Sequence, residues 1–140
     1  MRSERQTLTV TADLDSLEPV RGFVHEVGIG AGLSEDQAGN LLLAVDEAVT
    51  NIITHGYESS TGDIEIDCLR ENGHLMIALR DHAPVYNPLL VEAPDLTQSP
   101  MDREAPGGFG MVLIKSMVDE VHYRTLPDGR NELTLISSIG

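Results

Sequence analysis

The sequence predicts an α+β domain, a two-layer α/β sandwich whose mixed, mostly antiparallel sheet carries its helices on one face. Three observations predict it: two hairpin signals, three helical segments between the strands, and 41% hydrophobic residues in a chain of 140. Strands joined by short turns pair antiparallel, and helices between them then share one side of the sheet. A chain of this length forms one core, so we expect a single domain over residues 1–140.

The chain begins with a predicted strand and a predicted helix. Residues 7–12 alternate between polar and apolar side chains, as a short half-buried strand does. Asp13 or Asp15 supplies the oxygen that caps the next helix, which we expect over residues 16–28. The glycine-rich run at residues 28–32 predicts the end of that helix, because glycine is a poor helix former.

A capping box predicts the start of a second and longer helix. Ser34 stands three residues before Gln37, so the two side chains can satisfy each other's backbone N–H groups. The helix then covers residues 35–55, and Gly56 stops it. Apolar residues recur along it at helical spacing, which indicates that one side packs on the sheet.

The central hairpin is the firmest local prediction. Strands at residues 64–69 and 75–79 flank Asn72-Gly73, the dipeptide that type I′ turns favour. Residues 83–108 follow with five prolines and few periodic apolar residues, which predicts a long loop. A loop of that length inside a compact domain is usually functional.

The last part of the chain predicts one helix and one more hairpin. The helix covers residues 109–118. Two strands at residues 121–126 and 132–137 then pair around Pro127-Asp128-Gly129, which are typical turn residues. These elements complete the helical layer and the sheet.

Composition excludes several classes of partner. The 23 acidic residues against 9 Lys and Arg give a net charge of −14, which repels a nucleic-acid backbone, so we expect no direct nucleic-acid partner. No stretch approaches the roughly 20 apolar residues that span a bilayer, and we expect a cytoplasmic protein without membrane contact. The single cysteine, Cys68, can form no internal disulfide and has no companion at metal-ligand spacing.

Three polar residues form a row on the long predicted helix. Glu47, Asn51 and His55 recur every four residues, so they line up along the edge of the apolar stripe and should not face open water. A carboxylate and an amide at such an edge need partners, and Mg²⁺ or a polarised hydroxyl would satisfy them. The alternative is a boundary row that is half exposed to solvent.

Two further segments have the composition of ligand sites. Asp81 ends a predicted strand, where its carboxylate could accept a hydrogen bond from an amino group, and Ala83 lets a ring approach the backbone. The run Gly107-Gly108-Phe109-Gly110 precedes a predicted helix, where backbone N–H groups converge on an anion such as phosphate. An ordinary acidic turn and an ordinary loop-to-helix turn are the alternatives.

The order of these segments resembles a known family. Residues 44–51, AVDEAVTN, followed by HGY at 55–57, resemble the N box of the anti-sigma-factor serine/threonine kinases, which have the Bergerat ATP-binding fold of the histidine-kinase-like ATPases. DHAPVYNP at 81–88 resembles their first glycine box, and residues 107–121 resemble the second. The resemblance covers nearly the whole chain, from residue 7 to residue 137.

The resemblance implies a role for each segment. In that family the N-box glutamate is the proposed general base and the asparagine holds Mg²⁺, roles that fall on Glu47 and Asn51. Asp81 would accept the adenine amino group of ATP, beside Ala83, and residues 83–107 would form a lid. The phosphates would lie on the second glycine box, at Gly107, Gly108, Phe109, Gly110 and Met111.

One departure leaves the activity open. The first glycine box of the family usually reads Asp-x-Gly, and Ala83 stands here in place of the glycine, so its methyl either crowds adenine or is tolerated. The first hypothesis is a kinase that phosphorylates an anti-anti-sigma-type partner and regulates a sigma factor, and the resemblance also raises a homodimer like that of the relatives. The second is a non-catalytic switch in which ATP changes partner affinity. A third is an α+β domain that binds no nucleotide.

Overall fold

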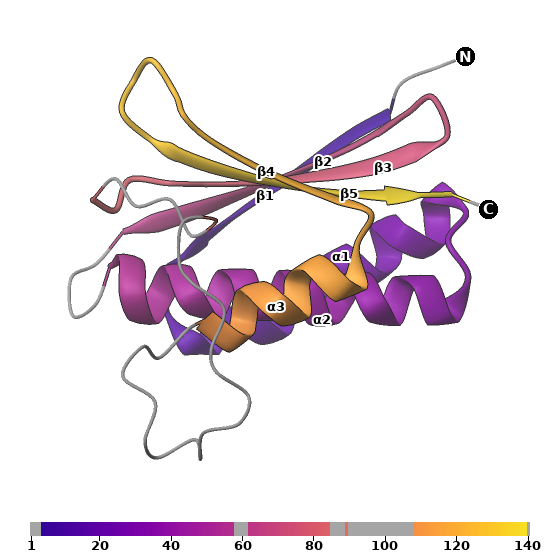
Figure 1. Cartoon of the computed structure of the whole chain (residues 1–140), viewed down its shortest axis with the longest axis horizontal. Helices are drawn as coiled ribbons and strands as arrows, with labels where there is room; N and C mark the ends of the chain where they lie inside the picture. The colour runs from indigo at the N-terminus through magenta and orange to yellow at the C-terminus, as the bar shows by residue number, and fades with distance from the viewer. Residues whose placement is uncertain (1–3, 58–61, 85–88, 90–107, 140) are drawn as a thin grey trace.

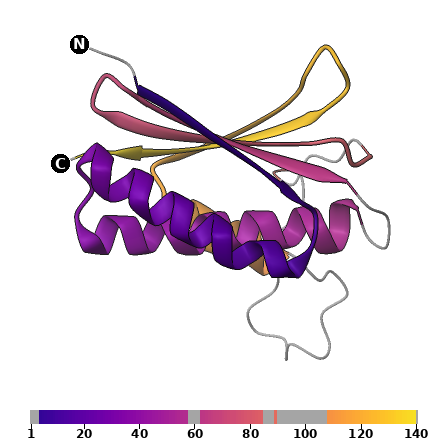
Figure 2. The same ribbon diagram turned by 180° about the vertical axis from the view of Figure 1, so that it is seen from behind.

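The computed structural model describes residues 4–57, 62–84, 89 and 108–139. It has two layers, a five-stranded sheet and a layer of helices that all lie on one face of it (Figure 1). The view from behind shows the same two layers, with the helices below the sheet and no helix of the described residues above it (Figure 2). The predicted fold class, α+β with helices on one side, is therefore confirmed.

The first helix is longer than predicted. β1 (Glu4–Thr11) leads through the 3₁₀ turn η1 (Leu14–Ser16) into α1 (Leu17–Ala31). α1 does not end at Gly28; it ends where Gly32 adopts a left-handed φ of 108°. Gly28 is helical, and its small size serves packing, because a Cβ there would lie 3.3 Å from the Leu33 side chain.

The capping of these helices follows the sequence in part. Asp13 caps η1, where its side chain accepts from the Asp15 N–H, and it does not cap α1. The capping box of α2 (Glu35–Asn51) is confirmed, since Ser34 Oγ accepts from Gln37 N at 3.1 Å and Gln37 Oε1 accepts from Ser34 N at 2.9 Å. The start of the long helix was therefore encoded locally.

The long helix changes its winding in its last turn. α2 continues directly into η2 (Ile52–Gly56), a π-helical segment in which Tyr57 N donates to Ile52 O at 2.9 Å. The helical run therefore stops at Gly56, as predicted, but the last turn contains one extra residue. That extra residue rotates the side chains after Asn51 relative to those before it.

The sheet is built from two hairpins and the strand β1. β2 (Asp63–Glu71) and β3 (His74–Asp81) are joined at Asn72 and Gly73, whose φ values of 53° and 77° are those of a type I′ turn. This predicted hairpin is confirmed. After α3 (Gly108–Met117), β4 (Glu120–Thr125) and β5 (Asn131–Ser138) form the second predicted hairpin.

The strand order decides which residues meet. It is β1-β2-β3-β5-β4, and every neighbouring pair is antiparallel. β5 therefore lies between β3 and β4, and its first residue, Asn131, pairs with Asp81, the last residue of β3. No local signal in the sequence gives this long-range register.

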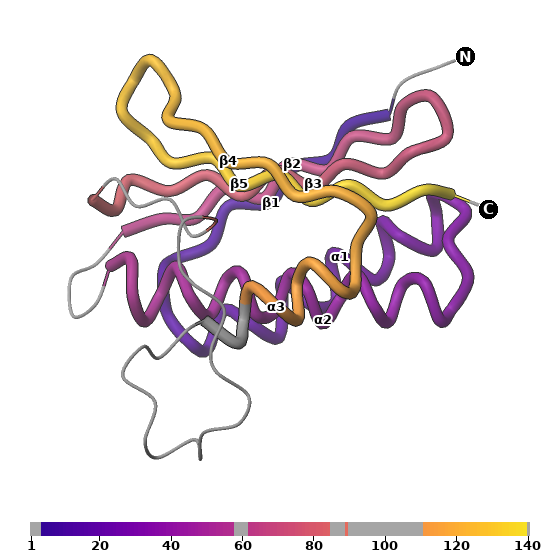
Figure 3. Tube along the Cα trace, in the orientation of Figure 1, coloured from indigo at the N-terminus to yellow at the C-terminus, as the bar shows by residue number. Residues whose placement is uncertain are grey.

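The core lies between the sheet and the helices. α2 is the central helix and contacts both α1 and α3, as the tube in Figure 3 makes visible. Its stripe of Leu41, Ala44, Val45 and Ala48 is fully buried, as the helical spacing predicted. Alternate residues of β2, β3 and β5 face this stripe, while the residues between them point to the uncovered face.

Candidate nucleotide site

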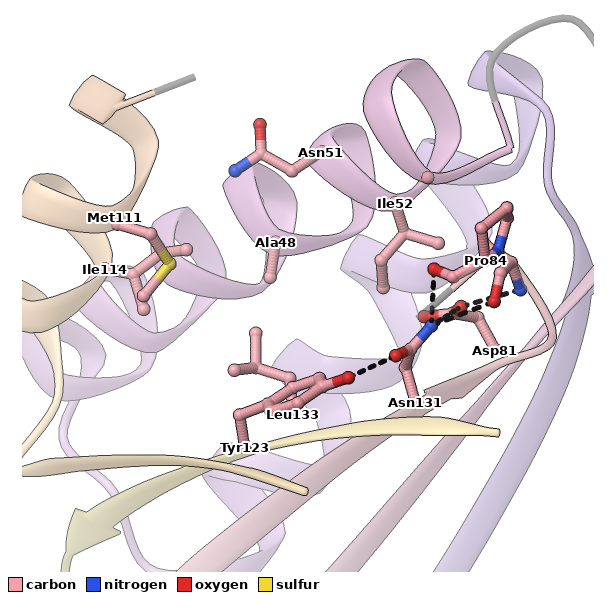
Figure 4. A pocket seen from close by; sticks show the side chains of 12 residues that line it. Ala48, Asn51, Ile52, Asp81, Pro84, Met111, Ile114, Tyr123, Asn131 and Leu133 are labelled. Atoms are coloured by element: carbon pink, nitrogen blue, oxygen red, sulfur yellow. Dashed lines mark hydrogen bonds between the residues drawn. The ribbon is translucent and has the colours of Figure 1, made fainter. Parts of the chain in front are cut away.

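A pocket opens at one end of the molecule, between the helices and the sheet (Figure 4). Its walls come from α2 and η2, from α3, and from the ends of β3, β4 and β5. Four of the residues singled out in the sequence line it together: Asn51, Asp81, Ala83 and Met111. The lining is mostly apolar, and the few polar groups are the side chains of Asn51, Asp81, Asn131 and Tyr123.

Asp81 is the buried acid of the pocket, with 5% of its surface exposed. Its Oδ1 accepts hydrogen bonds from Ala83 N at 2.9 Å and from the side-chain Nδ2 of Asn131 at 3.0 Å. Burial raises the pKa of Asp81 above its ordinary value, although these two hydrogen bonds and the charge of His82 lower it in part. The carboxylate thus has neutral hydrogen-bond partners and no salt bridge among the described residues.

Asn131 is a pocket residue that the sequence did not single out. Its Nδ2 lies within hydrogen-bond distance of Asp81 and of the backbone oxygens of Ala83 and Pro84, and its Oδ1 accepts from the hydroxyl of Tyr123. The predicted last strand began at residue 132, one position too late. Leu133 and Leu135 alternate as inward-facing residues, and continuing this alternation toward the N-terminus would have placed Asn131 on the same face.

Ala83, in the segment that resembles the first glycine box, lines the pocket beside Gly56. Its side chain is 5% exposed and packs against Gly56, where an added Cβ would lie 3.2 Å from the Ala83 Cβ. Next to it, Tyr57 joins two segments, because its hydroxyl donates to Asp63 O and accepts from His82 N, both at 2.8 Å. The backbone just after Asp81 is thereby connected through Tyr57 to the start of β2.

The row expected on α2 is only partly formed. Glu47 and Asn51 are half-buried, which fits both the expected row and its half-exposed alternative, whereas His55 is exposed. The π-helical turn explains the difference, because it rotates His55 away from the line of the two residues one and two turns earlier. Asn51 lines the pocket and Glu47 does not, and neither side chain has a hydrogen bond or ion pair to another described residue.

The second glycine box coincides with the start of α3. Gly107 lies outside the described residues, while Gly108, Phe109 and Gly110 form the first turn of the helix. Met111 follows in that turn, is 5% exposed and lines the pocket. The unbonded N–H groups of a first helical turn suit an anion, so this end of the pocket could receive a phosphate.

The residues present fit a magnesium nucleotide only if the nucleotide supplies most of the ligands. The described residues contain no cluster of three His, Cys, Asp or Glu side chains that could hold a metal ion. Asn51 lines the pocket and its side chain has no partner among those residues, and Mg²⁺ commonly takes one or two protein ligands together with phosphate oxygens and water. The expected lid, residues 83–107, is described only at Ala83, Pro84 and Leu89.

No helix in the described part of the chain is long and apolar enough to cross a membrane.

Comparison with known proteins places this geometry in a family. The model of the histidine kinase-like ATPase domain matches residues 10–137. The chain therefore belongs to the histidine kinase-like ATPase domain family, and the predicted family resemblance is confirmed. The match includes every segment that forms the pocket.

Curated relatives narrow the comparison. The serine-protein kinase RsbW of Oceanobacillus iheyensis is 29% identical over 64% of this chain and 60% of its own length. The serine/threonine-protein kinase BtrW of Bordetella bronchiseptica is 25% identical over 98% of this chain and 96% of its own length. The anti-sigma F factor of Clostridium acetobutylicum is 30% identical over 61% of this chain and 59% of its own length. The chain thus spans about three fifths of two of these relatives.

A solved structure shares the fold. The structure of the RsbU and RsbW domains of Rv1364c from Mycobacterium tuberculosis covers 96% of this chain, which in turn covers 32% of that protein. The TM-score is 0.64 at 17% identity. This likeness concerns the arrangement of helices and strands.

Proposed function

We propose that this chain binds Mg²⁺·ATP in the pocket and transfers the γ-phosphoryl group to a serine or threonine of a partner protein. One observation carries the nucleotide assignment: a buried carboxylate, Asp81, lies in a largely apolar pocket with one oxygen saturated by neutral donors. Such an acceptor suits the amino group of adenine. The names of RsbW and BtrW support the protein-kinase activity.

The pocket then holds the nucleotide at two ends. Asp81 accepts from the adenine amino group, while the ring lies against apolar groups such as Ile52 and Leu133. The phosphates lie toward the first turn of α3, at Gly108, Phe109 and Gly110, with Gly107 next to them in sequence. Asn51 would hold Mg²⁺, which offsets negative charge on the phosphates.

The chemistry assigned to this chain is a proton transfer and a displacement. Glu47 accepts the hydroxyl proton of the partner's serine or threonine as its oxygen forms a bond to the γ-phosphorus. The bond from that phosphorus to the bridging oxygen breaks, and ADP leaves. Glu47 and Asn51 are one turn apart on α2, so base and metal ligand share a face of one rigid helix.

The proposed partners follow from the relatives. The name of the anti-sigma F factor supports a sigma factor as one partner, and an anti-anti-sigma-type protein is the proposed phosphate acceptor. A homodimer is proposed on the same family grounds. Each partner would be a protein, because the net charge of −14 disfavours contact with nucleic acid.

A thermal-shift titration with ATP and Mg²⁺ tests the site without a partner. We expect ATP to stabilise the wild type only when the metal is present, and Asn51→Ala to lose most of that shift. Asn40→Ala is the matched control, because Asn40 is an exposed asparagine on the same helix. A wild-type melting temperature unmoved by millimolar nucleotide would refute nucleotide binding.

Glu47→Gln separates the kinase from the alternative, a non-catalytic nucleotide-gated switch. Ala83, which stands where the family usually has glycine, permits that alternative. For a kinase, Glu47→Gln keeps the ATP-induced thermal shift and loses transfer to an anti-anti-sigma-type protein by about a hundredfold or more. Equal and measurable ATP-dependent phosphorylation by the two proteins would exclude Glu47 as the base. ATP binding without any transfer by the wild type would favour the switch.

A further inference from the structure

The side-chain amide of Asn131 lies at the junction of three strands and the start of the long loop. Its Nδ2 is 3.0 Å from Asp81 Oδ1, 3.1 Å from Ala83 O and 3.3 Å from Pro84 O. All three of these atoms are hydrogen-bond acceptors. Asn131 itself is 6% exposed, so water does not compete freely for these contacts.

This environment fixes which way the amide faces. If the amide were turned over, its oxygen would meet three acceptors, which is repulsive. The Tyr123 hydroxyl therefore donates to Asn131 Oδ1 from β4, on the other side of the amide (Figure 4). The hydrogen-bond network therefore fixes the orientation of the Asn131 amide.

The fixed amide in turn fixes Asp81. Asp81 Oδ1 accepts from both Asn131 Nδ2 and Ala83 N, which occupies that oxygen. No described residue donates to Oδ2. One oxygen of Asp81 is thus used by the protein, and the other is left as an acceptor for whatever enters the pocket.

We propose that Asn131 is a positioning residue that makes the pocket select a 6-aminopurine, by holding Asp81 as an acceptor with one oxygen free for the base. This inference rests on the proposed ATP binding. Asn131 acts through Asp81, and Tyr123 acts through Asn131. The preference for a 6-aminopurine is lost when the side chain at position 131 can no longer donate a hydrogen bond to Asp81.

Among the residues that the structure describes, few charged and titratable groups surround this contact. They are Asp81 itself, His82 beside it on the chain, Tyr57 just after η2, and Tyr123 on β4. The pocket residues of α2 and α3 are uncharged: Ala48, Asn51, Met111 and Ile114. A carboxyl group introduced at position 131 would therefore interact above all with Asp81.

The test is Asn131→Asp, measured as the ratio of the dissociation constants of ATP and of purine riboside triphosphate, which lacks the 6-amino group. Taking a ratio cancels the titration of the phosphates and the metal, which the two nucleotides share. We expect the wild type to prefer ATP by about tenfold or more over the whole pH range. In the variant two carboxylates face each other, so the preference should fall towards one at about pH 8 and return in part at about pH 5.5, where the pair shares a proton.

Two further variants make the result interpretable. Asn40→Asp adds the same charge at an exposed site and should keep the wild-type ratio at every pH. Tyr123→Phe removes one hydroxyl and no charge, and should lower the ATP preference a few-fold without a new pH dependence. It also provides a readout if Asn131→Asp, checked by circular dichroism, does not fold.

The outcomes separate the two levels of the proposal. A wild-type preference that Tyr123→Phe lowers, and that the folded Asn131→Asp variant loses in a pH-dependent way, supports the role of Asn131. A wild-type ratio that persists unchanged in both variants refutes this inference while ATP binding stands. A wild type that binds neither nucleotide refutes the proposed function and this inference together.

Discussion

Two successive residue pairs of the β3–β5 ladder have opposite characters. Arg80 pairs with Glu132, and Asp81 pairs with Asn131 one position further along the chain. Because strand side chains alternate, the first pair lies on the uncovered face of the sheet and the second lies in the pocket. The same two strands therefore carry a charge network on one face and a candidate binding site on the other.

On the uncovered face the charges are neutralised. Arg80 contacts Glu132 at 2.7 Å, Glu65 at 2.6 Å and Asp67 at 3.1 Å, and Arg124 contacts Glu132 at 2.6 Å. Burial would raise the pKa of Glu132, but Arg124 and Arg80 outweigh burial and lower that pKa. In the pocket Asp81 has no such cation, and burial dominates to raise its pKa. Glu132 therefore serves stability, whereas Asp81 is left available for a ligand.

The largest expected effect is on the charge network. Arg80→Met removes the cation that contacts three carboxylates, of which Glu132 is 7% and Asp67 8% exposed. We expect a loss of about 3 kcal/mol in the free energy of unfolding at neutral pH, measured by urea denaturation. Arg124→Met is the control, because Arg124 is 69% exposed and its loss should cost under about 1 kcal/mol.

The stabilisation by Arg80 should depend on pH. A carboxylate with a lowered pKa in the folded state stabilises the protein above its unfolded pKa, about 4.3 for Glu, and this contribution is lost as pH falls through the folded value. The difference in unfolding free energy between the wild type and Arg80→Met should therefore become smaller as the pH falls. A difference that stays constant down to the acid transition would show that Arg80 stabilises by packing alone.

A smaller effect is expected at the pocket wall. Gly56→Ala places a methyl 3.2 Å from that of Ala83, and we expect a loss of about 1 kcal/mol in unfolding free energy. The double variant Gly56→Ala/Ala83→Gly should recover most of it, because the contact is then relieved. Urea denaturation of the four proteins measures the coupling, and additive effects would mean that the two methyl groups do not meet.

The smallest effect on stability is expected at Asp81 itself. A carboxyl group whose pKa is raised in the folded state makes the protein less stable as the pH rises through that pKa. Asp81→Asn removes this unfavourable ionisation at neutral pH. Its unfolding free energy should be equal to the wild type or higher by up to about 1 kcal/mol. ATP affinity should nevertheless fall by about tenfold or more, because the new amide can present a donor where adenine needs an acceptor. A strongly destabilised variant would contradict the contrast between the two pairs.

Residues that act on their near neighbours were predictable from the sequence. The capping box at Ser34 and Gln37, the turn at Asn72 and Gly73, and the buried stripe of α2 each depend on a few adjacent positions, and each was found where predicted. The spacing of Glu47 and Asn51 and the glycines at the start of α3 also indicated candidate site residues, whose roles stay predictions.

The tertiary structure alone decided how the pocket is completed. Asn131 meets Asp81 only because β5 inserts between β3 and β4, and pairing between residues 50 positions apart leaves no local pattern. The π-helical turn that exposes His55 and the continuation of α1 past Gly28 were also seen only in the structure. Local sequence sets which elements form, whereas strand order and packing decide which side chains share a site.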